Sequence, residues 1–110
     1  MATSYKVLGQ TAPAATTATT LYTVPAATEA VISTISVCNR GADAGTFRIA
    51  VRPDGATLAD EHYIAYDVAL DASATIPWTI GITMGDTDII TVYASSADIS
   101  FNAFGSEITA

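Results

Sequence analysis

Apolar and polar residues alternate with a period of two along most of the chain, which is the pattern of half-buried β-strands. β-Branched and aromatic residues dominate the alternating segments, as they do in strands. No apolar spacing of three and four residues is sustained, so helices are not expected. Five apolar series each fall on one face of an extended segment: Val31, Ile35 and Val37; Phe47, Ile49 and Val51; Ile64, Tyr66, Val68 and Leu70; Ile76, Trp78, Ile80, Ile82 and Met84; Ile90, Val92 and Ala94.

Turn residues separate these segments and delimit the strands. In Arg52–Gly55 a proline presets one backbone dihedral and a glycine tolerates a positive one. Without helices for parallel crossovers, the strands must pair antiparallel. We therefore predict an all-β fold, an antiparallel β-sandwich of jelly-roll type, with a partly closed barrel as the alternative. It has about eight strands, near residues 4–9, 20–24, 29–38, 46–52, 61–70, 74–83, 88–94 and 99–104.

The pattern divides the chain into residues 1–20, an N-terminal strand followed by an Ala/Thr-rich arm or linker, and residues 21–110, a single β-sandwich domain. Thr11–Thr20 has no large apolar side chain, so it cannot anchor itself in a core. We expect an extended arm that orders along a neighbouring subunit; a flexible loop over its own domain is the alternative. The candidate interface residues on the preceding strand are Tyr5, Val7 and Leu8, and residues 105–110 are expected to be loosely held.

Low charge is the most unusual feature of the composition. Of the 110 residues, 50% are hydrophobic and 14% are charged, roughly half the charged share of an ordinary soluble domain. A surface of small uncharged side chains costs little to desolvate, which favours burial against a partner. The formal net charge of −7 repels phosphate, so we expect no direct nucleic-acid binding.

Targeting and membrane signals are not expected in this chain. The first ten residues contain one lysine and no long apolar run, unlike a signal peptide. No stretch reaches the roughly 18 apolar residues of a membrane helix. We expect synthesis in a cytoplasm and no membrane association.

Catalytic arrangements are not recognisable in the sequence, and we expect no enzyme activity, cofactor or metal site. His62 is the single histidine, and neighbouring residues of a strand point to opposite faces, so Asp60 and Glu61 build no proton relay with it. Cys38, the single cysteine, is expected in the core, as is Trp78. Asp86 and Asp88 flank a turn, where aspartate commonly binds local backbone, although a Ca²⁺ ion there is conceivable.

Three of the four basic residues lie close together in sequence: Arg40, Arg48 and Arg52. Arg48 and Arg52 share one face of a strand, about 13 Å apart by the rise per residue. Arginine binds carboxylates through two parallel bonds and is common at interfaces. These residues are candidates for docking on the acidic face of another subunit or of a shell. In the alternative, each pairs internally with a cross-strand carboxylate.

Six segments carry a resemblance to known proteins: Leu21–Ala26, Ala30–Ser33, Ser36–Gly41, Thr46–Val51, His62–Asp67 and Ser100–Glu107. Through these segments, most of the chain from Leu21 onwards resembles the small virion proteins of tailed bacteriophages. The resemblance implies a structural component of the head or tail, and it brings no catalytic residues.

These observations lead to three hypotheses about function. The first is a capsid cement or decoration protein that binds the major capsid protein or other virion proteins as a homo-oligomer, with a trimer favoured. Its N-terminal segment, up to about Thr20, would cross onto neighbouring subunits. The second is a tail, fibre or baseplate component. The third is a carbohydrate-binding module that stacks sugars on Trp78, Tyr63, Tyr66 or Tyr93.

Overall fold

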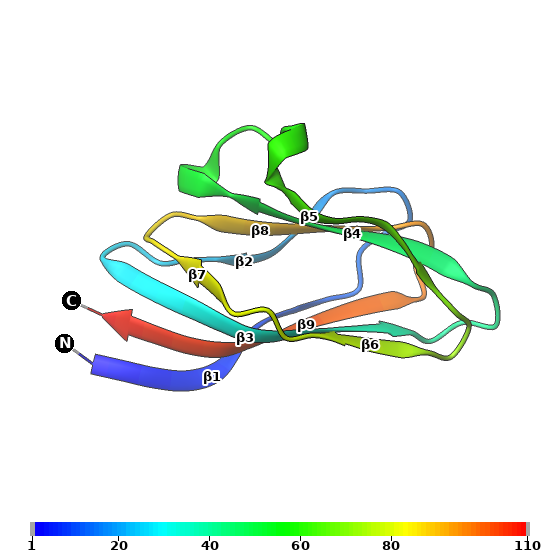
Figure 1. The fold of residues 1–110 in the computed structure, drawn as a ribbon, viewed down its shortest axis with the longest axis horizontal. Helices are drawn as coiled ribbons and strands as arrows, with labels where there is room; N and C mark the ends of the chain where they lie inside the picture. Colours follow the sequence, from blue (N-terminus) through cyan, green and yellow to red (C-terminus); the bar gives the residue numbers. More distant parts are fainter. Residues whose placement is uncertain (1, 110) are drawn as a thin grey trace.

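Two antiparallel β-sheets, stacked face to face, make up the fold (Figure 1). The computed structural model describes residues 2–109. Two short 3-10 turns, Pro53–Gly55 and Asp60–His62, project from one sheet. The strands are β1 (Ala2–Thr11), β2 (Thr19–Thr23), β3 (Thr28–Asn39), β4 (Gly45–Arg52), β5 (Tyr63–Leu70), β6 (Thr75–Trp78), β7 (Ile82–Met84), β8 (Ile89–Ala94) and β9 (Ile99–Thr109).

The first sheet has the order β1-β9-β3-β6, with β7 also paired to β3, and the second has the order β2-β8-β4-β5. Every pairing is antiparallel. The predicted all-β antiparallel sandwich is therefore confirmed. β1 and β2 lie along one flank of the molecule, while β5 and the β6–β7 segment lie along the opposite flank, which faces the viewer in Figure 1.

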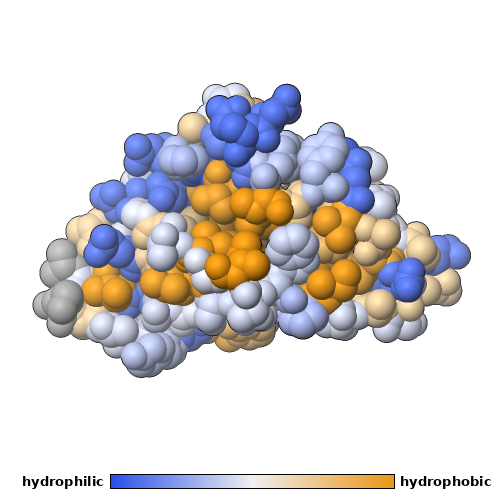
Figure 2. All heavy atoms as spheres, in the orientation of Figure 1, coloured by the Kyte–Doolittle hydropathy of each residue, from blue (hydrophilic) through white to orange (hydrophobic). Residues whose placement is uncertain are grey.

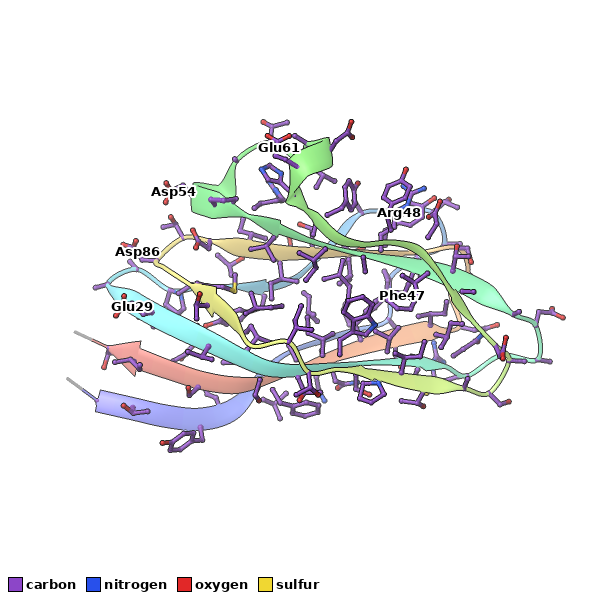
Figure 3. The ribbon with its side chains drawn as sticks, viewed as in Figure 1. Glu29, Phe47, Arg48, Asp54, Glu61 and Asp86 are labelled. Atoms are coloured by element: carbon purple, nitrogen blue, oxygen red, sulfur yellow. The ribbon has the colours of Figure 1, made fainter. Side chains whose placement is uncertain are left out.

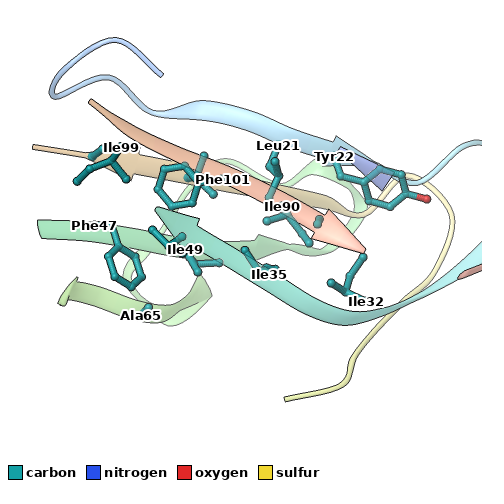
Figure 4. Packing of buried hydrophobic residues seen from close by; sticks show 14 of the residues in the cluster. Leu21, Tyr22, Ile32, Ile35, Phe47, Ile49, Ala65, Ile90, Ile99 and Phe101 are labelled. Atoms are coloured by element: carbon teal, nitrogen blue, oxygen red, sulfur yellow. The ribbon is translucent and has the colours of Figure 1, made fainter. Parts of the chain in front are cut away.

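The core fills the space between the sheets (Figure 4). Phe47 makes edge-to-face contacts with Phe101, at 6.1 Å between ring centroids, and with Trp78, at 6.3 Å. The predicted inward series Ile90, Val92 and Ala94 is fully buried. Trp78 packs against this core from a partly buried position, as expected.

β-Bulges break the period of two at several points and overturn part of the predicted face assignment. In β3 the register with β9 shifts between Ile32 and Thr34, so Val31 lies on the opposite face from Ile35. In β5, Tyr66 and Asp67 together oppose one residue of β4, and Asp67 adopts a positive φ of 49°. A bulge turns the residues on its two sides to different faces. Ile64 and Tyr66 therefore face solvent, whereas Ala65 is buried.

The predicted strand 74–83 is interrupted, so the chain has nine strands over the residues that the structure describes. Gly81 has a φ of 65°, a left-handed conformation that ends the extended run between β6 and β7. Ile80, predicted to face the core, is 54% exposed as a result. The last strand continues to Thr109 rather than ending near residue 104, so the prediction of a loose C-terminal end is wrong up to that residue.

The prediction of an extended N-terminal arm is also wrong. Residues 2–11 form β1, which is paired with β9 along its whole length. The Ala/Thr-rich segment that follows crosses from one sheet to the other. It is held by buried Pro13 and by a hydrogen bond from the Thr16 N–H to the Ala94 carbonyl oxygen, 2.8 Å. Backbone pairing thus anchors a segment that lacks large apolar side chains.

Candidate contact surfaces

An exposed apolar patch follows β1, an edge strand. Tyr5 is 86% exposed, Val7 49% and Phe104 39%. Val7 lies opposite Phe104 in the β1–β9 register, and Tyr5 lies opposite Ser106 on the same outer face. We call Tyr5, Val7 and Phe104 the β1 patch. Within residues 2–109, no strand pairs with the free edge of β1. Such an edge, beside exposed aromatic rings, is typical of a protein–protein contact.

The neighbourhood of the β1 patch is poor in charge. Among residues 2–28 only Lys6 is charged. On the outer face beside the patch, Gln10 donates to Asn102 at 2.7 Å, and Thr34 and Thr79 share a hydrogen bond at 3.2 Å. Covering such a surface displaces water from neutral groups and requires no ion to be desolvated.

Lys6 is used on the inner side of β1. Its Nζ lies 2.6 Å from Glu107 Oε1, and Tyr22 donates its hydroxyl proton to Glu107 Oε2 at 2.5 Å. Hydrogen bonds from Lys6 and then from Tyr22 lower the pKa of the Glu107 carboxyl, while burial and the same bond raise the pKa of Tyr22. The network joins β1, β9 and β2. Leu8, a predicted interface residue, packs against the core instead.

A second apolar surface lies on the opposite flank, between the two sheets (Figure 2). On β5, Ile64 is 37% exposed and Tyr66 57%, and Ile80, between β6 and β7, is 54% exposed. We call these three residues the β5 patch. Nearby, the buried Trp78 Nε1 has no hydrogen-bond partner among the described residues. Residues 72–85 carry no charged side chain, so this flank is also poor in ions.

Arg48 projects outward from β4, away from the core residue Phe47 beside it (Figure 3). Its Nε lies 2.6 Å from Asp67 Oδ1, and its guanidinium carbon lies 4.2 Å from the ring centroids of both Tyr66 and Tyr93. The hydrogen bond to Asp67 raises the Arg48 pKa further above its usual value. Tyr63 contacts Tyr66 edge to face at 4.9 Å. We call these five residues the tyrosine–arginine cluster.

The other two candidate arginines are held by their own neighbours. Arg52 donates to the carbonyl oxygens of Ala56, 2.7 Å, and Gly55, 3.2 Å, and to Thr91 Oγ1, 3.2 Å. Arg40 donates to the Ala97 carbonyl oxygen at 2.9 Å. Arg48 follows the internal alternative, since its partner is a cross-strand carboxylate. The three arginines therefore each have intramolecular partners, and none of them contacts either apolar patch except Arg48, through Tyr66.

The remaining chemical candidates serve local structure. His62 Nδ1 accepts a hydrogen bond from the Ala59 N–H at 3.0 Å. As predicted, Asp88 binds local backbone, accepting from the Gly85 N–H at 2.8 Å. It also accepts from the N–H of Asp54, which is distant in sequence, at 2.8 Å. The prediction of a core position for Cys38 is wrong. It is partly exposed on the outer face of β3, because Val37 and Asn39 take the inward positions.

An open depression of about 400 Å³ lies at the end of the sandwich near Glu29 and Asp86, which Figure 3 places at the same end. Its other lining residues are Ala27, Thr28, Gly85, Ile108 and Thr109. Among residues 2–109, no group of three or more His, Cys, Asp or Glu side chains is placed to hold a metal ion. No helix in this range is long and apolar enough to cross a membrane.

Comparisons with known proteins assign no family to this chain, so the surfaces described above are the evidence for its function. No family model matches the chain, and no curated protein or solved structure is significantly similar to it.

Proposed function

We propose that this chain is a non-enzymatic structural protein of a tailed-bacteriophage virion, a cement or decoration protein that binds and stabilises the head shell. The observation that carries the proposal is the β1 patch. A tyrosine ring that is 86% exposed, beside two further apolar side chains on a charge-poor strand, is suited to contact with protein. The partners would be the major capsid protein or other virion proteins, together with copies of the chain itself.

The order in which the strands pair supports this proposal. Pairing runs from the ends of the chain inwards: β1 with β9, β2 with β8, β3 with β6 and β7, and β4 with β5. One long hairpin rolled over into two sheets has this pairing. We therefore infer a jelly roll, the double-sheet architecture that viral capsid domains commonly use.

Particle composition tests the proposal. The phage that encodes this chain would be purified, and the copies of the chain per particle would be counted by quantitative gel and by particle imaging. Because repeated weak contacts around a symmetric shell add to strong binding, we expect hundreds of copies on the head. Absence of the chain from purified particles would contradict a virion role.

The tail, fibre or baseplate alternative makes a different prediction for the same measurement. A component of the tail is present in a few to tens of copies, and it would be imaged away from the shell. Heat stability separates the two further, since loss of a cement protein weakens the head while loss of a tail component leaves the head intact.

A carbohydrate-binding role is the second candidate, and the tyrosine–arginine cluster favours it. Tyr66 remains 57% exposed although Arg48 lies over its ring, and Asp67 and Arg48 offer hydrogen-bonding groups beside it. Aromatic rings with adjacent polar groups suit the stacking and orientation of a sugar. Glycan-array binding that is lost in Tyr66→Ser and kept in Tyr5→Ser would support this role, and the absence of binding by the unaltered chain would exclude it.

A further inference from the structure

The large apolar side chains that residues 2–109 leave exposed fall into two groups on opposite flanks. The β1 patch lies at one edge of the first sheet, and Ile80 of the β5 patch follows β6 at its other edge. Ile64 and Tyr66 lie on β5, the edge strand of the second sheet on that same flank. Because the two patches lie on strands at opposite edges of the sandwich, we expect each to meet a different partner surface.

We propose that the β1 patch of one copy packs against the β5 patch of the next copy, so that the chain assembles head to tail. This inference rests on the proposed function, that the chain works by contact, and it names a second copy as the occupant of both patches. An interface built from two different patches leaves one of each free after the first contact. Repetition then closes a ring or extends a filament, whereas a single self-complementary patch would stop at two copies.

The distribution of charge favours a second copy as the occupant. The chain has a net charge of −7, so two copies repel each other unless they meet where carboxylates are few. None of the eleven acidic residues lies within residues 2–28, and only Asp67 and Asp71 lie within residues 63–85. Asp67 is already paired with Arg48, and Lys6 is already paired with Glu107. Within these two segments, Asp71 is the one charged residue without an ion-pair partner.

The flanks are also large enough for a stable contact between two copies. The molecule measures 45 by 27 by 20 Å along its principal axes, and the side that carries the β5 patch is the one seen along the shortest axis in Figures 1 and 2. A stable protein–protein contact buries about 800 Å² on each partner. A side of 45 by 27 Å can supply that area without using the charged loops at the ends of the sandwich.

The experiment uses two variants of the full chain that each damage one patch. Tyr5→Glu places a charge in the β1 patch, and Ile80→Glu places one in the β5 patch. Both positions are exposed, so the fold is expected to survive, and circular dichroism would verify it. Val7→Glu and Ile64→Glu form a second pair. Ala42→Glu, in the exposed loop between β3 and β4, adds the same charge away from both patches and is the control.

Light scattering coupled to size exclusion would measure the mass of each protein. We expect the unaltered chain and Ala42→Glu to have a multiple of 11.3 kDa, and each patch variant to have 11.3 kDa. An equimolar mixture of Tyr5→Glu and Ile80→Glu should recover a mass of two chains, because the intact β5 patch of the first binds the intact β1 patch of the second.

Three results would overturn the inference. The first is an unaltered chain that is monomeric, and the second is a patch variant that keeps the full mass. The third is a mixture of the two variants that stays monomeric, because only a contact between two different patches allows the variants to rescue each other. These results are distinguishable from failure of the proposed function. A monomeric chain that still coats phage heads refutes only the head-to-tail contact, while a ring that is absent from every particle refutes only the virion role.

Discussion

β1 and β5 are both edge strands with an exposed tyrosine, yet they are held to the molecule from opposite sides. The charged contact that anchors β1 lies on its inner side, where Lys6 forms an ion pair with Glu107 and Tyr22 donates a hydrogen bond to the same carboxylate. The charged contact that anchors β5 lies on its outer side, where Asp67 forms an ion pair with Arg48 and the Arg48 guanidinium lies over the Tyr66 ring. Tyr5 is thereby left 86% exposed, whereas Tyr66 already has intramolecular contacts on its ring.

The difference shows how an edge strand can be anchored without using its outer surface. A buried carboxylate network secures β1 from within, so its outward side chains remain available to a partner. An outer network secures β5 but occupies part of the aromatic surface there. Of the two tyrosines, Tyr5 therefore has more of its ring available for contact with another molecule.

Removal of the inner anchor should have the largest effect. Glu107→Ala leaves the buried Tyr22 hydroxyl without its acceptor, and we expect a loss of about 1–3 kcal/mol in the free energy of unfolding. Lys6→Met should cost less than about 1 kcal/mol, because the Lys6 side chain is half exposed and water screens its ion pair. Urea unfolding of both variants measures the two losses. Equal losses would show that the ion pair, rather than the tyrosine bond, anchors β1.

Acid should weaken the same anchor. Because the folded-state pKa of Glu107 lies below its ordinary value of 4.5, the network contributes its full stability above that pH. The contribution is lost as the pH falls through the lowered folded-state pKa. Melting temperatures measured from about pH 7 down to about pH 3 should converge for the unaltered chain and Glu107→Gln. If the two melting temperatures still differ at the lowest pH, the ionised Glu107 carboxylate is not the source of the added stability.

Removal of the outer anchor should have a smaller effect. Arg48→Met deletes an ion pair with a partly exposed carboxylate and two stacking contacts, and we expect a smaller loss in the free energy of unfolding than for Glu107→Ala, because water screens the pair. Tyrosine fluorescence and urea unfolding would measure it. A loss larger than that of Glu107→Ala would reverse the contrast between the two strands.

Tyr5 should contribute least to folding. Tyr5→Ser is expected to change the free energy of unfolding by no more than about 0.5 kcal/mol, since the side chain is 86% exposed. The measurement belongs in the Ile80→Glu background, where the head-to-tail contact is absent and assembly adds nothing to stability. A larger loss in that background would mean that Tyr5 holds its own strand rather than a neighbouring copy.

The class of fold and much of the core can be predicted from the amino-acid pattern alone. Alternation with period two predicts strands because successive side chains point to opposite faces, and Phe47, Ile90 and Val92 are buried as that pattern requires. The low charge of the chain and the apolar residues Tyr5 and Val7 also predict part of the β1 patch.

Which side chains face outward, and which segments pair, depends on contacts between parts of the chain that are distant in sequence. The bulge in β5 inserts a residue and reverses the faces beyond it, so Ile64 and Tyr66 lie on the surface and not in the core. Ile80 is exposed because the left-handed backbone at Gly81 ends the extended run there. Glu107 was not recognised, because its role depends on Lys6 and Tyr22, which lie 101 and 85 positions away in sequence. The sequence predicts an arm at the N-terminus because this segment is attached through backbone hydrogen bonds, which depend on the presence of β9 alongside and not on side-chain type.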